Sequence, residues 1–115
     1  MPELIDIVRE AALDKKAEDL TILDVRGRTI VADYFVIATG RSRVQTRAIA
    51  DAIDEAAKAS GLRVVRTEGY LDGGWILLDL ASVVVHIFTP DQRAFYNLER
   101  LWGSPAAPAQ ESSSA

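Results

Sequence analysis

The segment at 73–88, GGWILLDLASVVVHIF, constrains the fold of this chain more than any other stretch. It predicts two strands joined by a two-residue turn at Ala81 and Ser82, with three consecutive valines in the second strand. Because the second strand is apolar on both faces, we expect it to lie inside a sheet rather than at an edge. The rest of the chain must then supply its neighbouring strands and the helices that cover them.

The first strand of this hairpin has two different faces, because side chains alternate along a strand with a period of two. One face is wholly aliphatic and suits a core under helices; it consists of Ile76, Leu78 and Leu80. The other carries Trp75, Leu77 and Asp79, a mixture typical of a surface that docks a partner. Core packing is the alternative. Asp79 favours docking, since an unpartnered buried carboxylate is costly and an exposed one can pair with a partner's basic side chain.

Helical and strand patterns alternate along the whole chain. We expect helices at 2–16, 42–61 and from Thr89 onward, and strands at 20–25, 29–39 and 62–68 besides the hairpin. Hairpins and crossovers both occur, so the fold class is α/β, with a mixed sheet of about five strands and helices on one or both faces.

Two of these helices have an apolar face that we expect to pack on the sheet. In the helix at 42–61 this face consists of Val44, Ala48, Ile49, Ala52, Ile53 and Ala56. In the last helix it consists of Phe95, Leu98, Leu101 and Trp102.

Length and composition indicate one domain at 1–102, followed by a disordered tail at 103–115 that is small, polar and proline-bearing. There is no cysteine and only one histidine, His86, so a disulfide framework and a His-rich metal site are excluded. Neither a membrane span nor an export signal is evident, and we expect a cytoplasmic protein. The net charge of -4 makes contact with RNA peripheral at most.

Two segments raise the question of catalysis or ligand binding. The motif TGRSR at 39–43 places a glycine, a serine and two arginines at a helix start, where phosphate can bind; a plain helix cap is the alternative that we favour. Nucleotidyl transfer needs carboxylates that converge on shared metal ions, whereas Glu68 and Asp79 are single acids on separate strands. A nucleophile with its base is also missing, so we expect neither an enzyme nor a cofactor.

His86 lies on the second hairpin strand, on the same face as Val84 and Phe88. It is either a hydrogen-bonded, partly buried structural histidine, which we favour, or a polar contact at a partner surface whose charge responds to mild acid.

Several motifs together resemble the ribosomal silencing factor family, whose members are also called Iojap-like proteins. They are DYFVIATGRS at 33–42, EGY at 68–70, WILLDL at 75–80, VVVHIF at 83–88 and FYNLERLW at 95–102. The resemblance implies a non-enzymatic factor that binds the large ribosomal subunit through its ribosomal protein fourteen. Such a factor sterically blocks joining of the small subunit and represses translation when nutrients are scarce. It also implies a nucleotidyltransferase-like topology without the catalytic carboxylates.

The resemblance assigns partner contacts to individual residues. The family's tryptophan and aspartate fall on Trp75 and Asp79 and its strand histidine on His86; we expect Leu77 to join them, with Tyr70 and His86 as weaker contacts. The family's Gly-Asp turn is replaced by Ala81 and Ser82, which fit a positive φ less well. A nucleotide-binding or nucleotidyltransferase-like protein is the alternative function, and a homodimer that buries Trp75 against itself is compatible with the first.

Overall fold

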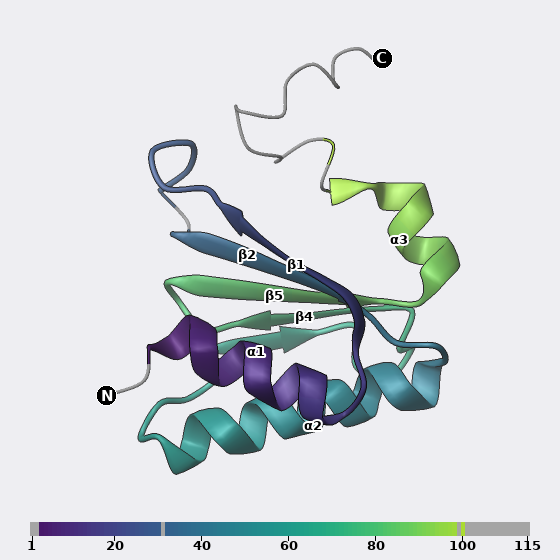
Figure 1. Ribbon diagram of the computed structural model, residues 1–115, viewed down its shortest axis with the longest axis horizontal. Helices are drawn as coiled ribbons and strands as arrows, with labels where there is room; N and C mark the ends of the chain where they lie inside the picture. Colours follow the sequence, from purple (N-terminus) through teal and green to yellow (C-terminus); the bar gives the residue numbers. More distant parts are fainter. Residues whose placement is uncertain (1–2, 31, 99, 101–115) are drawn as a thin grey trace.

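The structure is a computed structural model, and it describes residues 3–30, 32–98 and 100. Three helices and a five-stranded sheet make up this part of the chain (Figure 1). In chain order they are α1 (Leu4–Asp14), β1 (Glu18–Asp24), β2 (Tyr34–Thr39), α2 (Arg43–Ala59), β3 (Arg66–Glu68), β4 (Trp75–Asp79), β5 (Val83–Phe88) and α3 (Pro90–Tyr96). The predicted tail at 103–115 lies outside the described residues.

β5 is the central strand, as its apolar pattern predicts. The strand order is β1-β2-β5-β4-β3, and all six residues of β5 are buried. β5 pairs in parallel with β2, which places His86 beside Ile37, and antiparallel with β4, which places His86 beside Leu77. β1 and β3 pair antiparallel with β2 and β4. The mixed five-stranded sheet of an α/β fold is therefore confirmed.

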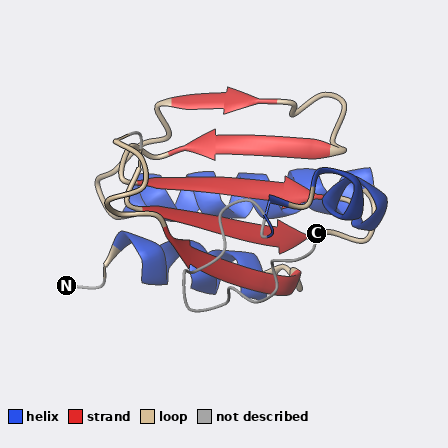
Figure 2. Cartoon of the chain, turned by 90° about the horizontal axis from the view of Figure 1, so that it is seen from above, coloured by secondary structure: helices blue, strands red, loops and turns tan. Residues whose placement is uncertain are grey.

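α1 and α2 cover one face of the sheet and seal the main core (Figures 1 and 2). Val8 of α1 and Ile49 and Ile53 of α2 are fully buried there. The aliphatic face of β4 packs against them, so the expected function of Ile76, Leu78 and Leu80 as core residues is confirmed. Burial of these apolar side chains is the main stabilising contribution to the fold.

The opposite face of the sheet, which we call the α3 face, carries Trp75, Leu77 and Asp79 of β4 and Val84, His86 and Phe88 of β5. α3 lies over one end of it (Figure 2). A second buried cluster forms on this face, with Phe35, Ile37 and Phe88 among its members and Trp75, Leu77 and Leu98 partly buried against it. Helices thus lie on both faces of the sheet, but unequally.

Two strands are shorter than their sequence patterns predict. β2 begins at Tyr34 rather than at 29, because Thr29 forms only an isolated bridge with Arg26 across Gly27, which has φ +82°, and does not join the sheet ladder. β3 spans only Arg66–Glu68, because Gly61 at φ +80° ends α2 and the following residues form a connection. In this connection, the first hydrogen bond to β4 comes from the amide of Val65, which donates to the carbonyl of Asp79.

The packing faces predicted for α2 and α3 are partly wrong. Phe95 is 77% exposed, because α3 is short and its outer side carries this residue, and the next residue, Tyr96, contacts the sheet instead. Val44, in the first turn of α2, is 71% exposed, and Thr46 is buried in its place. Leu98 is half-buried as expected. Leu101 and Trp102 lie outside the described residues.

Candidate partner-binding face

Trp75 lies at the centre of an aromatic cluster on the α3 face. Its ring stacks on Phe88 with a centroid distance of 5.1 Å and contacts the ring of Tyr96 at 4.4 Å. Its indole N–H donates to Nδ1 of His86 over 3.1 Å. The side chain is nevertheless only half-buried. Trp75 is therefore a fixed aromatic group with part of its surface accessible, which is the form that an interface anchor takes.

His86 is enclosed on this face, with 6% of its surface exposed. Because Nδ1 accepts from Trp75, the neutral imidazole carries its proton on Nε2, and Nε2 has no hydrogen-bond partner among the described residues. Burial lowers the pKa of His86 to about 4, so the ring is neutral at neutral pH. These features favour the structural interpretation of His86; its contact with a partner stays a prediction.

Asp79 forms a hydrogen bond within the chain that the sequence did not reveal. Its Oδ1 accepts the backbone N–H of Ala81 over 2.9 Å, and Ala81 has φ +70°. The carboxylate thus supports the turn in which alanine replaces the glycine that this backbone conformation favours. Asp79 is half-buried and satisfied locally, so its burial alone is no argument for a charged partner.

Tyr70 is not brought together with Trp75, Leu77 and Asp79. Its hydroxyl donates to the carboxylate of Asp51 on α2, with oxygen distances of 3.0 and 3.1 Å, and its ring packs against the core on the helix side. The hydrogen bond to Asp51 raises the pKa of Tyr70, with desolvation adding to the shift. The structure gives Tyr70 a role in attaching its loop to α2.

The loop at 69–74 positions the start of β4, and hence Trp75, through contacts with α2. The Thr46 hydroxyl donates to the carbonyl of Gly73 over 2.6 Å in a buried position. The Arg43 guanidinium donates to the carbonyl and the carboxylate of Asp72, over 2.9 and 2.8 Å. Gly69 has φ +77°, and a Cβ there would collide with the carbonyl of Trp75. The sequence offered no signal for Thr46, because a threonine inside a helix has many environments.

The TGRSR motif forms a helix cap. The Ser42 hydroxyl accepts the amide of Gln45 over 3.1 Å, and the Gln45 side chain accepts the amide of Arg41 over 2.9 Å. Arg41 pairs with Glu18 over 2.7 Å, and Arg43 pairs with Asp72. The two arginines therefore have carboxylate partners, and the cap interpretation is confirmed.

The carboxylates weighed for nucleotidyl transfer do not form a metal site. Glu68 pairs with Arg66 over 3.3 Å, while Asp79 supports its turn. Within residues 3–30, 32–98 and 100, no group of three or more histidines, aspartates or glutamates is arranged to hold a metal ion. In the same part of the chain, no helix combines the length and apolar character needed to cross a membrane.

Comparison with known proteins decides the family. The model of the family described as "Ribosomal silencing factor during starvation" matches residues 1–115. The chain belongs to the ribosomal silencing factor family. Relatives named as ribosomal silencing factors include one from Halalkalibacterium halodurans, 45% identical over 88% of this chain and 86% of its own length. One from Bacillus subtilis is 46% identical over 87% and 85% of the two chains.

The family extends to plants and to solved structures. A chloroplastic Iojap protein of Zea mays is 38% identical over 83% of this chain and 41% of its own length. A crystal structure from Chromobacterium violaceum superposes with a TM-score of 0.86 at 35% identity, covering 88% of this chain and 84% of that one. A second, from Bacillus halodurans, gives a TM-score of 0.79 at 42% identity, covering 86% and 92%. The silencing factor fold is thus common to all three chains.

Proposed function

We propose that this silencing factor docks its α3 face on the large ribosomal subunit, through ribosomal protein fourteen of that subunit. The observation that carries the proposal is the partly exposed Trp75, fixed between Phe88, His86 and Tyr96 with Leu77 beside it on β4. Family membership supplies the ribosome as the setting. A rigid aromatic anchor loses little conformational freedom on binding, so it contributes strongly to affinity.

The mechanism needs no chemical step. A folded domain bound to the surface that faces the small subunit occupies volume that the small subunit requires, so repression follows occupancy. Translation is thereby reduced when nutrients are scarce, and the factor acts as a binding protein rather than as an enzyme.

Charge supports the choice of a protein partner. The chain has a net charge of -4, and a ribosomal protein surrounded by RNA offers basic side chains. Opposite charges favour encounter with that protein, while contact with ribosomal RNA stays peripheral. On the α3 face, we expect the carboxylate of Asp79 to pair through its second oxygen with an arginine or lysine of the partner. This encounter takes place in the cytoplasm, where the ribosomes lie.

Two substitutions test the face without disturbing its supports. Leu77→Glu places a charge on a partly exposed position and should weaken binding to large subunits by about tenfold or more. Asp79→Asn retains an oxygen for the amide of Ala81 and removes the charge, so it should weaken binding by about two- to fivefold. Co-sedimentation with isolated large subunits gives the affinities, and light scattering follows their reassociation with small subunits.

Leu13→Glu is the matched control, because Leu13 is 51% exposed on α1, on the other side of the sheet. It should bind and block reassociation as the unaltered protein does. Equal affinity of Leu77→Glu and the unaltered protein for large subunits would reject the α3 face as the docking site. Sedimentation of the free protein as a dimer that Leu77→Glu dissociates would instead assign this face to a homodimer.

A further inference from the structure

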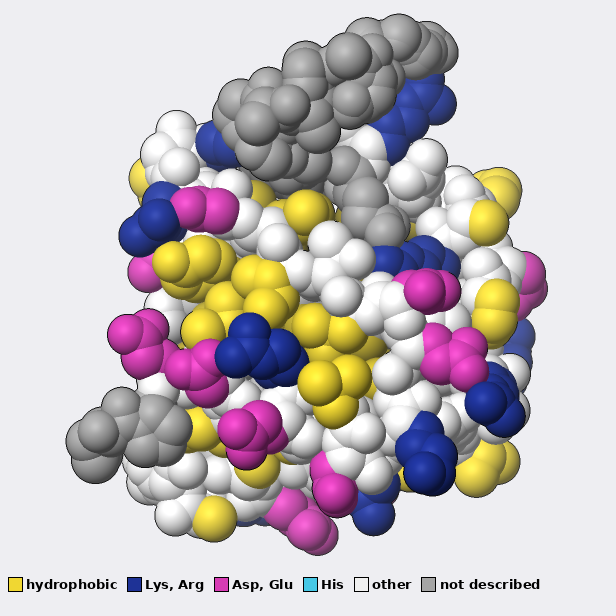
Figure 3. Space-filling model, viewed as in Figure 1, with side chains coloured by type: hydrophobic (Ala, Val, Ile, Leu, Met, Phe, Trp, Pro, Cys, Tyr) yellow, Lys and Arg dark blue, Asp and Glu magenta, His cyan; other side chains and the backbone are white. Residues whose placement is uncertain are grey.

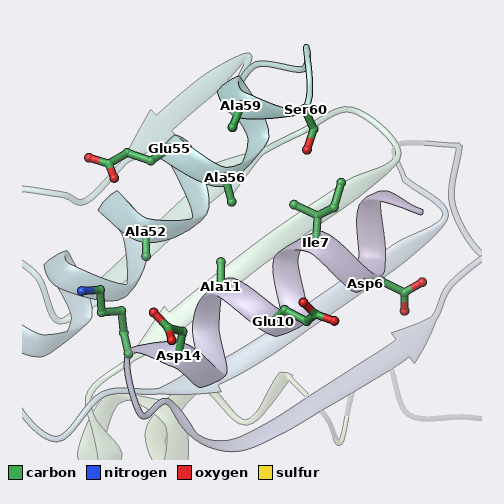
Figure 4. A pocket seen from close by; sticks show the side chains of 11 residues that line it. Asp6, Ile7, Glu10, Ala11, Asp14, Ala52, Glu55, Ala56, Ala59 and Ser60 are labelled. Carbon is green, nitrogen blue, oxygen red and sulfur yellow. The ribbon is translucent and has the colours of Figure 1, made fainter. Parts of the chain in front are cut away.

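A groove of about 660 Å³ runs between α1 and α2, on the opposite side of the sheet from the α3 face (Figure 4). Its floor is apolar, because three half-buried alanines, Ala11 of α1 and Ala52 and Ala56 of α2, point into the space between the helices. Ile7 lengthens this floor. Small side chains on both helices leave room that a partner's larger side chains can fill.

Carboxylates border this floor. Asp6, Glu10 and Asp14 follow one another at intervals of four residues along α1, and Glu55 lies on α2. Figure 3 shows acidic side chains gathered over α1. Of the described residues that line the groove, only Lys15 is basic. Like charges four residues apart destabilise a helix, so α1 does not gain stability from this row.

Most of these carboxylates form no ion pair within the described part of the chain, unlike several acids elsewhere in the structure. Asp6 pairs with Arg9 over 2.6 Å. Among the residues that the structure describes, Glu10, Asp14 and Glu55 take part in no ion pair, whereas Asp24, Asp54 and Asp72 each have one. Three uncompensated acids therefore flank an apolar floor.

We propose that the groove between α1 and α2 binds a basic amphipathic helix of a protein partner. The apolar side of such a helix fills the space above the alanines, and its lysines or arginines meet the flanking carboxylates. Residues four apart on α1 are separated by about 6 Å along its axis, and basic residues four apart on a partner helix have the same spacing. The site is separate from the α3 face, so its occupant and the ribosome can bind at the same time.

Charge and shape together select this occupant. A row of carboxylates repels nucleic acid phosphates and an acidic segment alike. A small organic cation would satisfy the carboxylates but would leave the apolar floor uncovered. A second copy of this chain, with its net charge of -4, brings the same sign of charge to the groove.

The probe is a synthetic amidated helix of roughly 18 residues, with leucines and alanines on one side and lysines at intervals of four on both flanks. Titrated into the full-length protein and followed by NMR, it should shift the amide signals of Ile7, Ala11 and Ala56 and leave those of β4 unchanged. Glu10→Gln with Asp14→Asn should weaken binding by about 2- to 30-fold. Asp19→Asn with Glu68→Gln, which removes two exposed charges outside the groove, should change it by less than about twofold.

Shape is tested separately from charge. Ala56→Leu fills the floor without changing any charge and should weaken binding by about tenfold or more, whereas Ala94→Leu, exposed on α3, should have no effect. The proposal is overturned if the probe does not bind, or if the two double variants weaken binding of the probe equally. It is also overturned if Ala56→Leu binds unchanged, which marks a cation-binding surface alone. If the amide signals of the groove shift with protein concentration in the absence of the probe, the groove is an interface with a second copy of the chain.

Discussion

His86 shows how burial turns an ordinary side chain into a determinant of stability. Its pKa falls from 6.5 in the unfolded chain to about 4 in the folded protein because the buried site disfavours the charged ring. Between these values the unfolded chain binds the proton and the folded protein does not. His86 therefore contributes full stability above about pH 6.5, and this contribution declines as the pH falls toward 4.

The size of this effect can be measured. A depression of about 2.5 pKa units corresponds to a loss of about 3 kcal/mol in the free energy of unfolding between pH 7 and pH 4. Urea unfolding of the unaltered protein and of His86→Phe at several pH values isolates it, because the carboxylates are common to both proteins. Identical pH dependence of the two proteins would show that His86 is not kept neutral by burial.

The turn at Ala81 gives a second prediction for a single residue. Ala81→Gly removes the steric cost of an alanine at φ +70° and raises the free energy of unfolding by up to about 1 kcal/mol, after allowing for the greater freedom of glycine in the unfolded chain. Ser82→Gly is the control, because Ser82 lacks a positive φ. Its free energy of unfolding should fall by about 0.4 to 1 kcal/mol, since glycine is freer in the unfolded chain. Thermal unfolding compares the two; stabilisation by Ser82→Gly alone would contradict the assigned turn geometry.

Among the elements, the attachment of the 69–74 loop to α2 determines where β4 begins. Thr46→Val leaves the buried carbonyl of Gly73 without its 2.6 Å hydrogen bond and should cost about 1 to 3 kcal/mol. Thr67→Val, exposed on the edge strand β3, should change stability by less than about 0.5 kcal/mol. Urea unfolding gives these values.

Hydrogen exchange tests the local part of that prediction. The amides of Gly73 and Gly74 should exchange faster in Thr46→Val than in Thr67→Val, because the loop has lost its attachment to α2. Exchange that is unchanged across the loop in Thr46→Val would show that Arg43, bonded to Asp72, and Arg47, which donates to the carbonyl of Leu71 over 3.1 Å, hold the loop without the threonine.

Elements with a strong local pattern were predictable, and those decided by distant contacts were not. The apolar run of β5 and the Ser42 cap of α2 follow from neighbouring residues, and both were found where expected. The choice between Phe95 and Tyr96 as the contact of α3 depends on how a short helix meets the sheet, which helical spacing does not specify. The bond from Asp79 to the turn and that from Thr46 to the loop likewise appear only once the backbone is folded.

At the scale of the whole molecule, the sheet separates two candidate binding faces. Leu77 lies on the α3 face and Ala56 on the groove between α1 and α2, with the buried core between them. Substitutions at such separated sites have additive effects. A double variant, Leu77→Glu with Ala56→Leu, should therefore lose as much affinity for large subunits as Leu77→Glu does, and as much affinity for the probe helix as Ala56→Leu does. Measured coupling above about 0.5 kcal/mol would show that the two faces communicate.

The position of β5 has a consequence for synthesis of the protein. β2 and the α1–α2 pair come off the ribosome well before Val83–Phe88, yet β2 depends on β5 as its neighbour on one side. A nascent chain that stops short of Phe88 has a gap in the middle of its sheet and leaves apolar strand surface to water. The sheet of this silencing factor is therefore completed only after Val83–Phe88 has been synthesised, later than α1, β2 and α2.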